Sequence, residues 1–182
     1  MVRSMWSDRP LGVKLAALVA AGAVALGVFA LITVQALQAT GDRVAELLQS
    51  NRATGEALEA DMMHDAVRGD VLAALLSSSD ADYRSAVADL ADHSASFRET
   101  LEAVTGEGLG AEVTAAVEAV TPDVEAYLVS ADQIIALAGV DRAAASAAYP
   151  QFAVAFAALE ESLPSVGEAI AAEAAAAEQQ TT

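Results

Sequence analysis

The sequence contains no cysteine and few proline, aromatic or basic residues. Among its 182 residues are four Pro, eight aromatic side chains and nine Lys or Arg. Without cysteine the chain has no disulfide framework, no zinc–thiolate or iron–sulfur site and no thiol nucleophile, and the cellular compartment is left open. The scarcity of proline and of large rings is typical of long helices around a slim core.

Alanine and acidic residues are what the sequence has in abundance. Forty-six residues are Ala, the strongest helix former, so helix is expected through most of the chain. The 26 acidic residues give a net charge of −17, yet 55% of the sequence is hydrophobic, which excludes ordinary disorder. A surface this acidic repels phosphate backbones, so we expect no nucleic-acid partner.

One apolar run near the N-terminus is long enough to cross a membrane. Residues 15–34 contain 20 consecutive uncharged, mostly aliphatic side chains, which span the roughly 30 Å hydrocarbon core of a bilayer. Residues 1–40 carry a net charge of +2, and residues 41–182 carry −19. The basic residues precede the run, so the positive-inside rule places the N-terminus in the cytoplasm. The residues concerned are Arg3, Arg9 and Lys14, with Trp6 as an interfacial anchor.

We therefore expect three regions: a cytoplasmic N-terminus at 1–14, a transmembrane helix at 15–40 and an extracytoplasmic domain at 41–182. A cleaved signal peptide is the alternative, because Ala36 and Ala39 offer small residues at a cleavage position. Signal peptides have apolar regions of about 7–15 residues, shorter than this run. Either interpretation exports the same domain.

After residue 41 the apolar residues recur in alternating steps of four and three, the spacing of helices packed nearly parallel. Short breaks separate four such runs, so neighbouring helices are expected to be antiparallel. The predicted fold is all-α: an up-down-up-down antiparallel four-helix bundle whose first helix continues from one transmembrane helix. The expected helices are 42–78, 81–106, 111–139 and 142–178, with kinks at Pro122 and Pro164.

The same spacing predicts which side chains form the core. In the first helix the run is Val44, Leu48, Asn51, Gly55, Leu58, Met62, Asp65, Gly69, Leu72 and Leu76. The second and third runs are Tyr83, Val87, Leu90, Ser94, Phe97, Leu101 and Val104, then Val113, Val117, Val120, Val124, Tyr127, Ala131, Ile134 and Ala138. The fourth is Tyr149, Phe152, Phe156, Leu159, Leu163, Val166 and Ile170.

Two stretches, residues 8–15 (DRPLGVKL) and 61–75 (DMMHDAVRGDVLAAL), resemble the sensory portion of bacterial methyl-accepting chemotaxis receptors. Sensor kinases and cyclases share this type of ectodomain. The resemblance implies a ligand-sensing domain of the bacterial cell membrane, acting as a homodimer and signalling by displacement of its last helix. It also implies a second span, a HAMP linker and an output domain after such a bundle, none of which is in residues 1–182. Whether the chain is a truncated receptor or a naturally short protein is open.

The densest polar group on the first helix predicts the site. Asp65 falls at a core position, where an unpaired carboxylate is costly. Folding the helices about their turns brings His64 near His93 and Ser94, with Glu125, Phe152 and Phe156 at a similar depth. The candidate ligand-binding residues are Asp61, His64, Asp65, Arg68, His93 and Tyr127, close to Asp70.

Three interpretations of this layer are open. In the first, Asp65 pairs with Arg68 to fix helix register, and both histidines lie at the solvated flank. In the second, Arg68 holds a small ligand, for example a carboxylate. In the third, His64, His93 and Glu125 bind a metal ion or haem, since imidazole and carboxylate suit divalent ions. No cofactor is otherwise indicated.

We expect no enzyme activity and assign no catalytic residue. The predicted function is ligand sensing by a chemoreceptor-type ectodomain, with a small molecule, the lipid bilayer and a second copy of the chain as partners. The rival is a membrane-anchored helical module that binds a partner protein and senses no small molecule.

Overall fold

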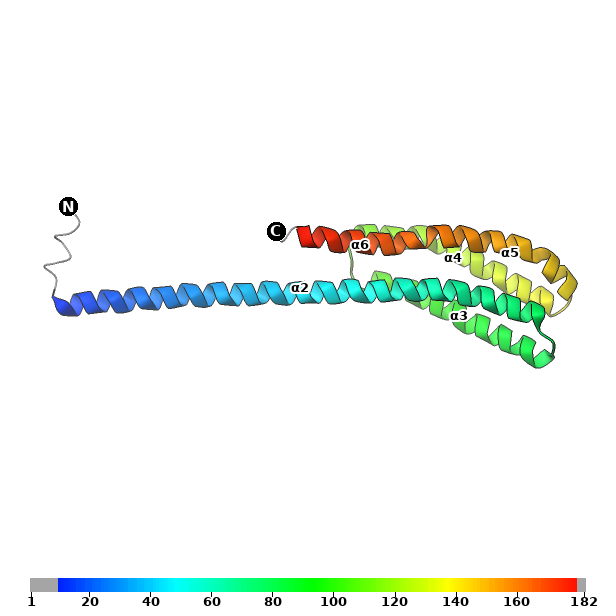
Figure 1. The fold of residues 1–182 in the computed structure, drawn as a ribbon, viewed down its shortest axis with the longest axis horizontal. Helices are drawn as coiled ribbons and strands as arrows, with labels where there is room; N and C mark the ends of the chain where they lie inside the picture. Colours follow the sequence, from blue (N-terminus) through cyan, green and yellow to red (C-terminus); the bar gives the residue numbers. More distant parts are fainter. Residues whose placement is uncertain (1–9, 180–182) are drawn as a thin grey trace. The chain divides into compact units, whose positions relative to one another are not determined.

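A computed structural model describes residues 10–179 of the chain, which are helical apart from short connections. The helices are α2 (Leu11–Leu76), α3 (Asp80–Gly106), α4 (Ala111–Ala138), α5 (Arg142–Ser162) and α6 (Pro164–Gln179), and no strand occurs within residues 10–179 (Figure 1). The predicted all-helical fold and the three predicted breaks are confirmed. The chain divides into two compact units, Met1–Glu46 and Leu47–Thr182.

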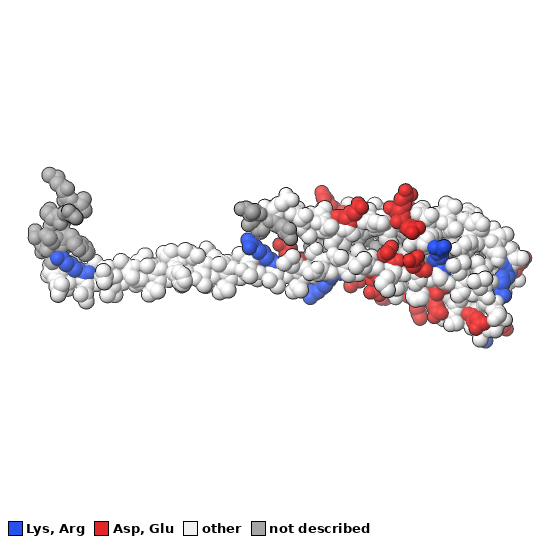
Figure 2. Space-filling model, viewed as in Figure 1, with Lys and Arg blue, Asp and Glu red and all other residues white. Residues whose placement is uncertain are grey.

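The first unit contains the apolar part of α2. An 18-residue window of this helix has a mean hydropathy of 2.6 and no buried residue. Its threonines donate their hydroxyls to the carbonyls one turn earlier, Thr33 to Phe29 and Thr40 to Ala36, both at 2.8 Å. In Figure 2 this stretch is free of charged side chains along most of its length. It is the one helix within residues 10–179 with the length and composition of a membrane span, a pattern that signal sequences share. Trp6, Arg3 and Arg9 lie outside the described residues.

The second unit has a core in which α4 packs against α3, α5 and α6 (Figure 1). All eight core residues predicted for the third helix are buried, from Val113 to Ala138. In the fourth predicted run, Phe152, Phe156 and the four residues that follow are buried, and Tyr149 is half-buried. The prediction also holds for most of α3, where Val87 is the exposed exception. The buried members of α3 are Leu90, Ser94, Phe97, Leu101 and Val104, joined by Ala86 and Thr100.

Capping side chains define where these helices begin. The Ser79 hydroxyl accepts a hydrogen bond from the Asp82 N–H at the start of α3, and the Asp141 carboxylate accepts one from the Ala144 N–H at the start of α5. Each satisfies an N–H group that has no partner within the helix. Ser77 follows α2, and the Arg142 guanidinium donates to its carbonyl at 2.6 Å and to its hydroxyl at 3.0 Å.

The turn between α3 and α4 depends on glycine. Gly108 has φ of 71°, a backbone conformation that side chains disfavour. Gly110 precedes α4, and its N–H donates to both carboxylate oxygens of Glu173 in α6, at 2.7 and 2.8 Å. An acidic group at a helix N-terminus is favourable because the free N–H groups there carry partial positive charge. Glu173 therefore joins α6 to the first turn of α4.

The predicted core face of the first helix is wrong: none of its ten residues is buried, and Leu72 alone is half-buried. Leu58, Met62 and Leu76 are 62%, 64% and 81% exposed, and Asp65 is exposed as well. The inward-facing residues follow the same four–three spacing two positions later, which lies on nearly the opposite side of a helix. Small residues occupy this face because large side chains from α4 and α5 fill the space beside it. The residues are Ala53, Ala57, Ala60, His64, Val67, Val71 and Ala74.

The fourth predicted helix is divided at Pro164. Helix α5 ends at Ser162, and α6 begins at Pro164, whose missing N–H ends the hydrogen-bond series. The interruption falls at the predicted kink and is local, since Leu163 keeps helical dihedrals (φ −59°, ψ −37°) and donates its N–H to the Leu159 carbonyl. Pro122 and Pro150 lie inside α4 and α5, which continue through them.

Candidate functional site

His64 lies at the centre of a buried aromatic layer between α2, α4 and α5. Only 1% of the residue is exposed, and its Nε2 is 3.1 Å from the Phe156 carbonyl oxygen. The Tyr127 hydroxyl, also fully buried, donates to the His64 carbonyl at 2.9 Å. These contacts meet the rule that buried polar groups are hydrogen-bonded. The prediction that both histidines lie at a solvated flank is wrong for His64.

Ring stacking orders the same layer. The His64 and Phe156 rings stack with centroids 4.1 Å apart and planes inclined by 12°, while Tyr127 meets His64 edge-on at 5.1 Å. Phe152 stacks on Tyr127 at 5.1 Å. The guanidinium carbon of Arg68 lies 4.4 Å from the centroid of the Phe156 ring, a cation–π contact. The structure thus brings together three helices that sequence pairing places at one depth.

Burial sets the protonation of this layer. Burial lowers the pKa of His64, outweighing the opposing contribution of the Phe156 carbonyl. Burial likewise raises the pKa of Tyr127, so its hydroxyl stays protonated and donating. The pKa of Arg68 is raised, chiefly by a hydrogen bond with the Tyr149 hydroxyl. The layer is a neutral stack with a permanent cation beside it.

The other predicted site residues of α2 lie away from this stack. Asp65 and Asp61 are exposed, and no ion pair joins Asp65 to Arg68 within residues 10–179. The expectation of a carboxylate in the core at Asp65 fails because the buried face of α2 lies two positions along. The buried carboxylate is that of Asp70 instead, at 7% exposure.

Asp70 pairs with His93 across α2 and α3. Its Oδ2 is 2.7 Å from His93 Nδ1, so His93 is engaged with Asp70 rather than with His64. Burial raises the pKa of Asp70, and the hydrogen bond from His93 opposes that shift. The pair satisfies a carboxylate that would be costly to bury alone.

Each of the three residues considered for a metal site is hydrogen-bonded to a different group. His64 contacts the Phe156 carbonyl, His93 contacts Asp70, and Glu125 contacts Arg98. No group of three His, Asp or Glu side chains within residues 10–179 is placed to hold a metal ion. The residues present therefore do not fit a metal or haem site at this layer.

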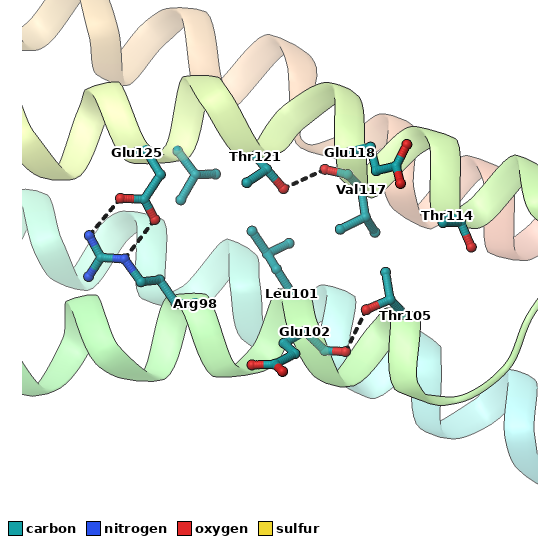
Figure 3. A pocket seen from close by; sticks show the side chains of 10 residues that line it. Arg98, Leu101, Glu102, Thr105, Thr114, Val117, Glu118, Thr121 and Glu125 are labelled. Atoms are coloured by element: carbon teal, nitrogen blue, oxygen red, sulfur yellow. Dashed lines mark hydrogen bonds and ion pairs between the residues drawn. The ribbon is translucent and has the colours of Figure 1, made fainter.

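A groove between α3 and α4, which sequence reasoning missed, has a volume of about 460 Å³. Figure 3 shows Arg98 and Glu125 at one end of it and Thr105 and Thr114 toward the other. The buried side chains of Leu101, Val117 and Val124 contribute its apolar lining. The signal for this groove in the sequence was a set of polar residues on the flanks of two helices. Such residues are usually found on any solvent-exposed helix face, so they did not predict a groove. The remaining lining residues are Glu102, Glu118 and Thr121.

A bidentate ion pair closes one end of this groove. Arg98 Nε and Nη2 donate to the two carboxylate oxygens of Glu125 at 2.6 and 2.8 Å. Arg98 accordingly lowers the pKa of Glu125, and Glu125 raises that of Arg98. The third nitrogen, Nη1, donates to the Ser94 carbonyl at 3.4 Å. Three of the five N–H groups of the guanidinium are therefore hydrogen-bonded.

A smaller cavity of about 220 Å³ lies beside the α5–α6 break. Asp61 lines it together with Leu58 and Thr54 from α2, opposite Leu163, Pro164 and Gly167. Asp61 therefore borders a different space from the one His64 fills.

No protein-family model, curated protein or solved structure matches this chain.

Proposed function

We propose that the chain is the ligand-sensing ectodomain of a chemoreceptor-type signalling protein of the bacterial cell membrane. Residues 47–179 would form an up-down-up-down antiparallel four-helix bundle, with α5 and α6 together as its fourth helix. The same bundle in a sensor kinase or cyclase is the alternative assignment.

One observation carries this proposal: α2 contains both a candidate membrane span and one wall of the helical core. Its apolar window is unburied, whereas its later residues Ala53 to Ala74 include the inward face of the second unit. A helix that takes part in both can carry a small shift from the bundle toward the membrane. Soluble proteins rarely expose an apolar stretch of this length to water.

The proposed orientation places residues 1–14 in the cytoplasm and the acidic unit outside the cell membrane. Lys14, at the start of the apolar run, suits the cytoplasmic interface, and no other lysine occurs in the chain. Figure 2 shows acidic side chains over the visible face of the second unit. Export of this acidic unit agrees with the rule that basic residues are retained on the cytoplasmic side.

We also propose a homodimer that uses the outer face of α2. Leu48, Leu58 and Met62 are 51%, 62% and 64% exposed and belong to the stripe with heptad spacing that the sequence predicted as core. A second copy of the same helix would cover these side chains in a coiled-coil seam. Cysteine substitution at Leu58 should give a disulfide-linked dimer, whereas Ala95→Cys, on the exposed side of α3, should not.

The decisive experiment is a small-molecule library screened by thermal unfolding of the full chain in lipid nanodiscs. Sensing requires that at least one compound raises the melting temperature and changes the crosslinking rate of the Leu58→Cys variant. If Arg68 holds that ligand, Arg68→Ala abolishes the stabilisation, whereas Arg84→Ala, on exposed α3 surface, preserves it. If no compound acts while a protein partner binds, the chain is the interaction module instead.

Orientation and anchoring have their own test. The chain has no native cysteine, so Ala95→Cys can be labelled alone. We expect a membrane-impermeant maleimide to label it in cells whose outer barrier is opened but whose inner membrane is intact. An intact mass that includes residues 1–40 supports the anchor, and loss of these residues indicates a cleaved signal peptide.

A further inference from the structure

Both histidines of the chain join α2 to a neighbouring helix. The sequence contains two, His64 and His93. His64, on α2, contacts the Phe156 carbonyl of α5 through Nε2 at 3.1 Å, and His93, on α3, contacts Asp70 of α2 through Nδ1 at 2.7 Å. His64 and Asp70 both lie on the buried face of α2, at 1% and 7% exposure. The contacts of α2 with α5 and with α3 therefore each include one imidazole.

A proton gained by His64 weakens its contact with α5. Among the described residues, the ring has one hydrogen bond, through Nε2, and it stacks on the Phe156 ring at 4.1 Å. The second N–H of an imidazolium would need an acceptor of its own. Its charge would also lie in a layer formed by Phe156 and Tyr127, where burial of a charge is costly. Acid therefore favours states in which this ring has left the stack.

The charged groups around His64 decide when this change occurs. Three exposed carboxylates favour the protonated ring, but burial outweighs them and lowers the pKa of His64. On α2, the Arg68 guanidinium is a permanent cation beside the stack, 4.4 Å from the Phe156 ring. On α4, Tyr127 stays neutral because burial raises its pKa. The three carboxylates are Asp61 and Asp65 on α2 and Glu160 on α5.

A proton gained by His93 has the opposite effect on the contact with α3. With Nδ1 protonated, the neutral ring donates one hydrogen bond to the Asp70 carboxylate, and the imidazolium adds the attraction of opposite charges. Salt screens this attraction only weakly because Asp70 is buried. Asp89, on α3, is the other charged group that acts on Asp70, and together with burial it raises the Asp70 pKa. Protonation of Asp70 itself, at still lower pH, would end the gain.

We propose that the bundle responds to acid: protons on His64 and His93 release α2 from α5 and hold it more tightly to α3. This inference rests on the proposed sensory function and adds a stimulus to it, because an extracytoplasmic unit meets the pH of its surroundings. Histidine is the side chain whose ordinary charge change falls between pH 5 and pH 8. The expected change is a helix displacement of about 1–2 Å, the usual size of such shifts.

The test measures two distances in the full chain in lipid nanodiscs by pulsed electron paramagnetic resonance, at pH 7 and at pH 5. Spin labels at Ala73→Cys and Ala158→Cys report on α2 and α5, and labels at Ala73→Cys and Ala95→Cys report on α2 and α3. All three positions are exposed, and labelled chains are diluted with unlabelled wild type so that each dimer carries one pair. We expect the α2–α5 distance to change by about 1–2 Å and the α2–α3 distance to change less. An unchanged α2–α5 distance at pH 5 overturns the proposal.

Matched variants assign the response to single imidazoles. His64→Gln keeps an N–H donor for the Phe156 carbonyl but gains no proton in this range, so it should abolish the α2–α5 change. His64→Phe does the same without the donor and serves if the glutamine variant unfolds. His93→Gln should preserve the α2–α5 change, and so should Glu168→Gln, which removes an exposed titratable group of α6. An α2–α5 change that persists in both His64 variants rejects this explanation.

The outcome separates the acid response from the sensory function. If pH moves neither helix but a library compound stabilises the chain and changes the Leu58→Cys crosslinking rate, the acid response is wrong and the sensory proposal stands. A second pair of labels, at Leu58→Cys in the two copies, reports on the dimer. If the α2–α5 distance responds through His64 while neither acid nor any compound changes the Leu58 separation, the acid response stands and the sensory proposal fails.

Discussion

His64 and Phe156 are joined twice: their rings stack at 4.1 Å, and the His64 Nε2 lies 3.1 Å from the Phe156 carbonyl oxygen. With Nε2 protonated, the neutral imidazole donates to that carbonyl, which fixes the tautomer. An additional proton would place a charge among Phe156, Tyr127 and the aliphatic core. The pair therefore links the packing of α2 on α5 to the protonation state of one side chain.

This link predicts a pH-dependent stability. Because the folded-state pKa of His64 lies below its ordinary 6.5, its contribution is complete above pH 6.5 and is lost as pH falls. Relative to His64→Phe, the wild-type free energy of unfolding should decrease between pH 7 and pH 5, by at most about 1.4 kcal/mol per pH unit. Urea unfolding of both chains, followed by circular dichroism, measures this. A difference that is flat over this range contradicts the expectation.

The Asp70–His93 pair should show strong coupling. Replacing His93 with Ala leaves the Asp70 carboxylate buried without its partner, at a cost of about 2 kcal/mol. The double variant His93→Ala, Asp70→Ala should lose less free energy of unfolding than the two single variants lose together. The difference, the coupling energy of a double-mutant cycle, should be about 1 kcal/mol. The Arg98–Glu125 pair is the control, because its side chains are 46% and 44% exposed, and its coupling should be about 0.5 kcal/mol. Equal coupling in both cycles would count against a special role of burial.

Two tyrosines that donate to backbone carbonyls should differ in importance. The Tyr127 and Tyr83 hydroxyls donate to the His64 and Ile135 carbonyls, both at 2.9 Å, but only Tyr127 is fully buried. We expect Tyr127→Phe to cost about 1.5 kcal/mol and Tyr83→Phe about 0.5 kcal/mol, since water can replace the lost partner only at the second site. Thermal unfolding of the two variants gives the order directly, and the reverse order is incompatible with this explanation.

Two glycines should respond in opposite ways to alanine. A Cβ at Gly139 would lie 2.5 Å from the Tyr83 hydroxyl oxygen, so Gly139→Ala forces that ring away from Ile135 and destabilises the fold. A Cβ at Gly167 meets nothing within 4 Å, so Gly167→Ala should stabilise α6 by up to about 1 kcal/mol. In a Tyr83→Ala background the cost of Gly139→Ala should disappear, and a persistent cost would show that the hydroxyl contact is not its cause.

Periodicity predicted the helical fold and much of its core because, in three of the four helices, the largest apolar side chains face inward. In α4 the run from Val113 to Ala138 is both the most apolar face and the buried one. Breaks at serine and glycine were equally visible, since Ser79 caps α3 and Gly108 adopts positive φ. These features depend on local residues, which the sequence displays.

The first helix could not be assigned in this way because it has two faces with heptad spacing. Leu58 and Met62 are more apolar than Ala53 and Ala60, so hydrophobicity alone selects the outer face. The choice depends on space left by Phe156 and Tyr127, residues far away in the sequence. The α3–α4 groove was missed for the same reason, because Arg98 and Glu125 meet only when two helices pack.

The small side chains on the inner face of α2 bear on how this helix holds its position along its axis. Ala53, Ala60 and Ala74 have small side chains that interlock little with the adjacent helices, so they offer little resistance to movement of α2 along its axis. His64 is the largest side chain on this face. Its ring stacks on the Phe156 ring, and its carbonyl accepts a hydrogen bond from the Tyr127 hydroxyl. His64 therefore contributes to the axial setting of α2 against α4 and α5, and a proton gained by the imidazole weakens that contribution.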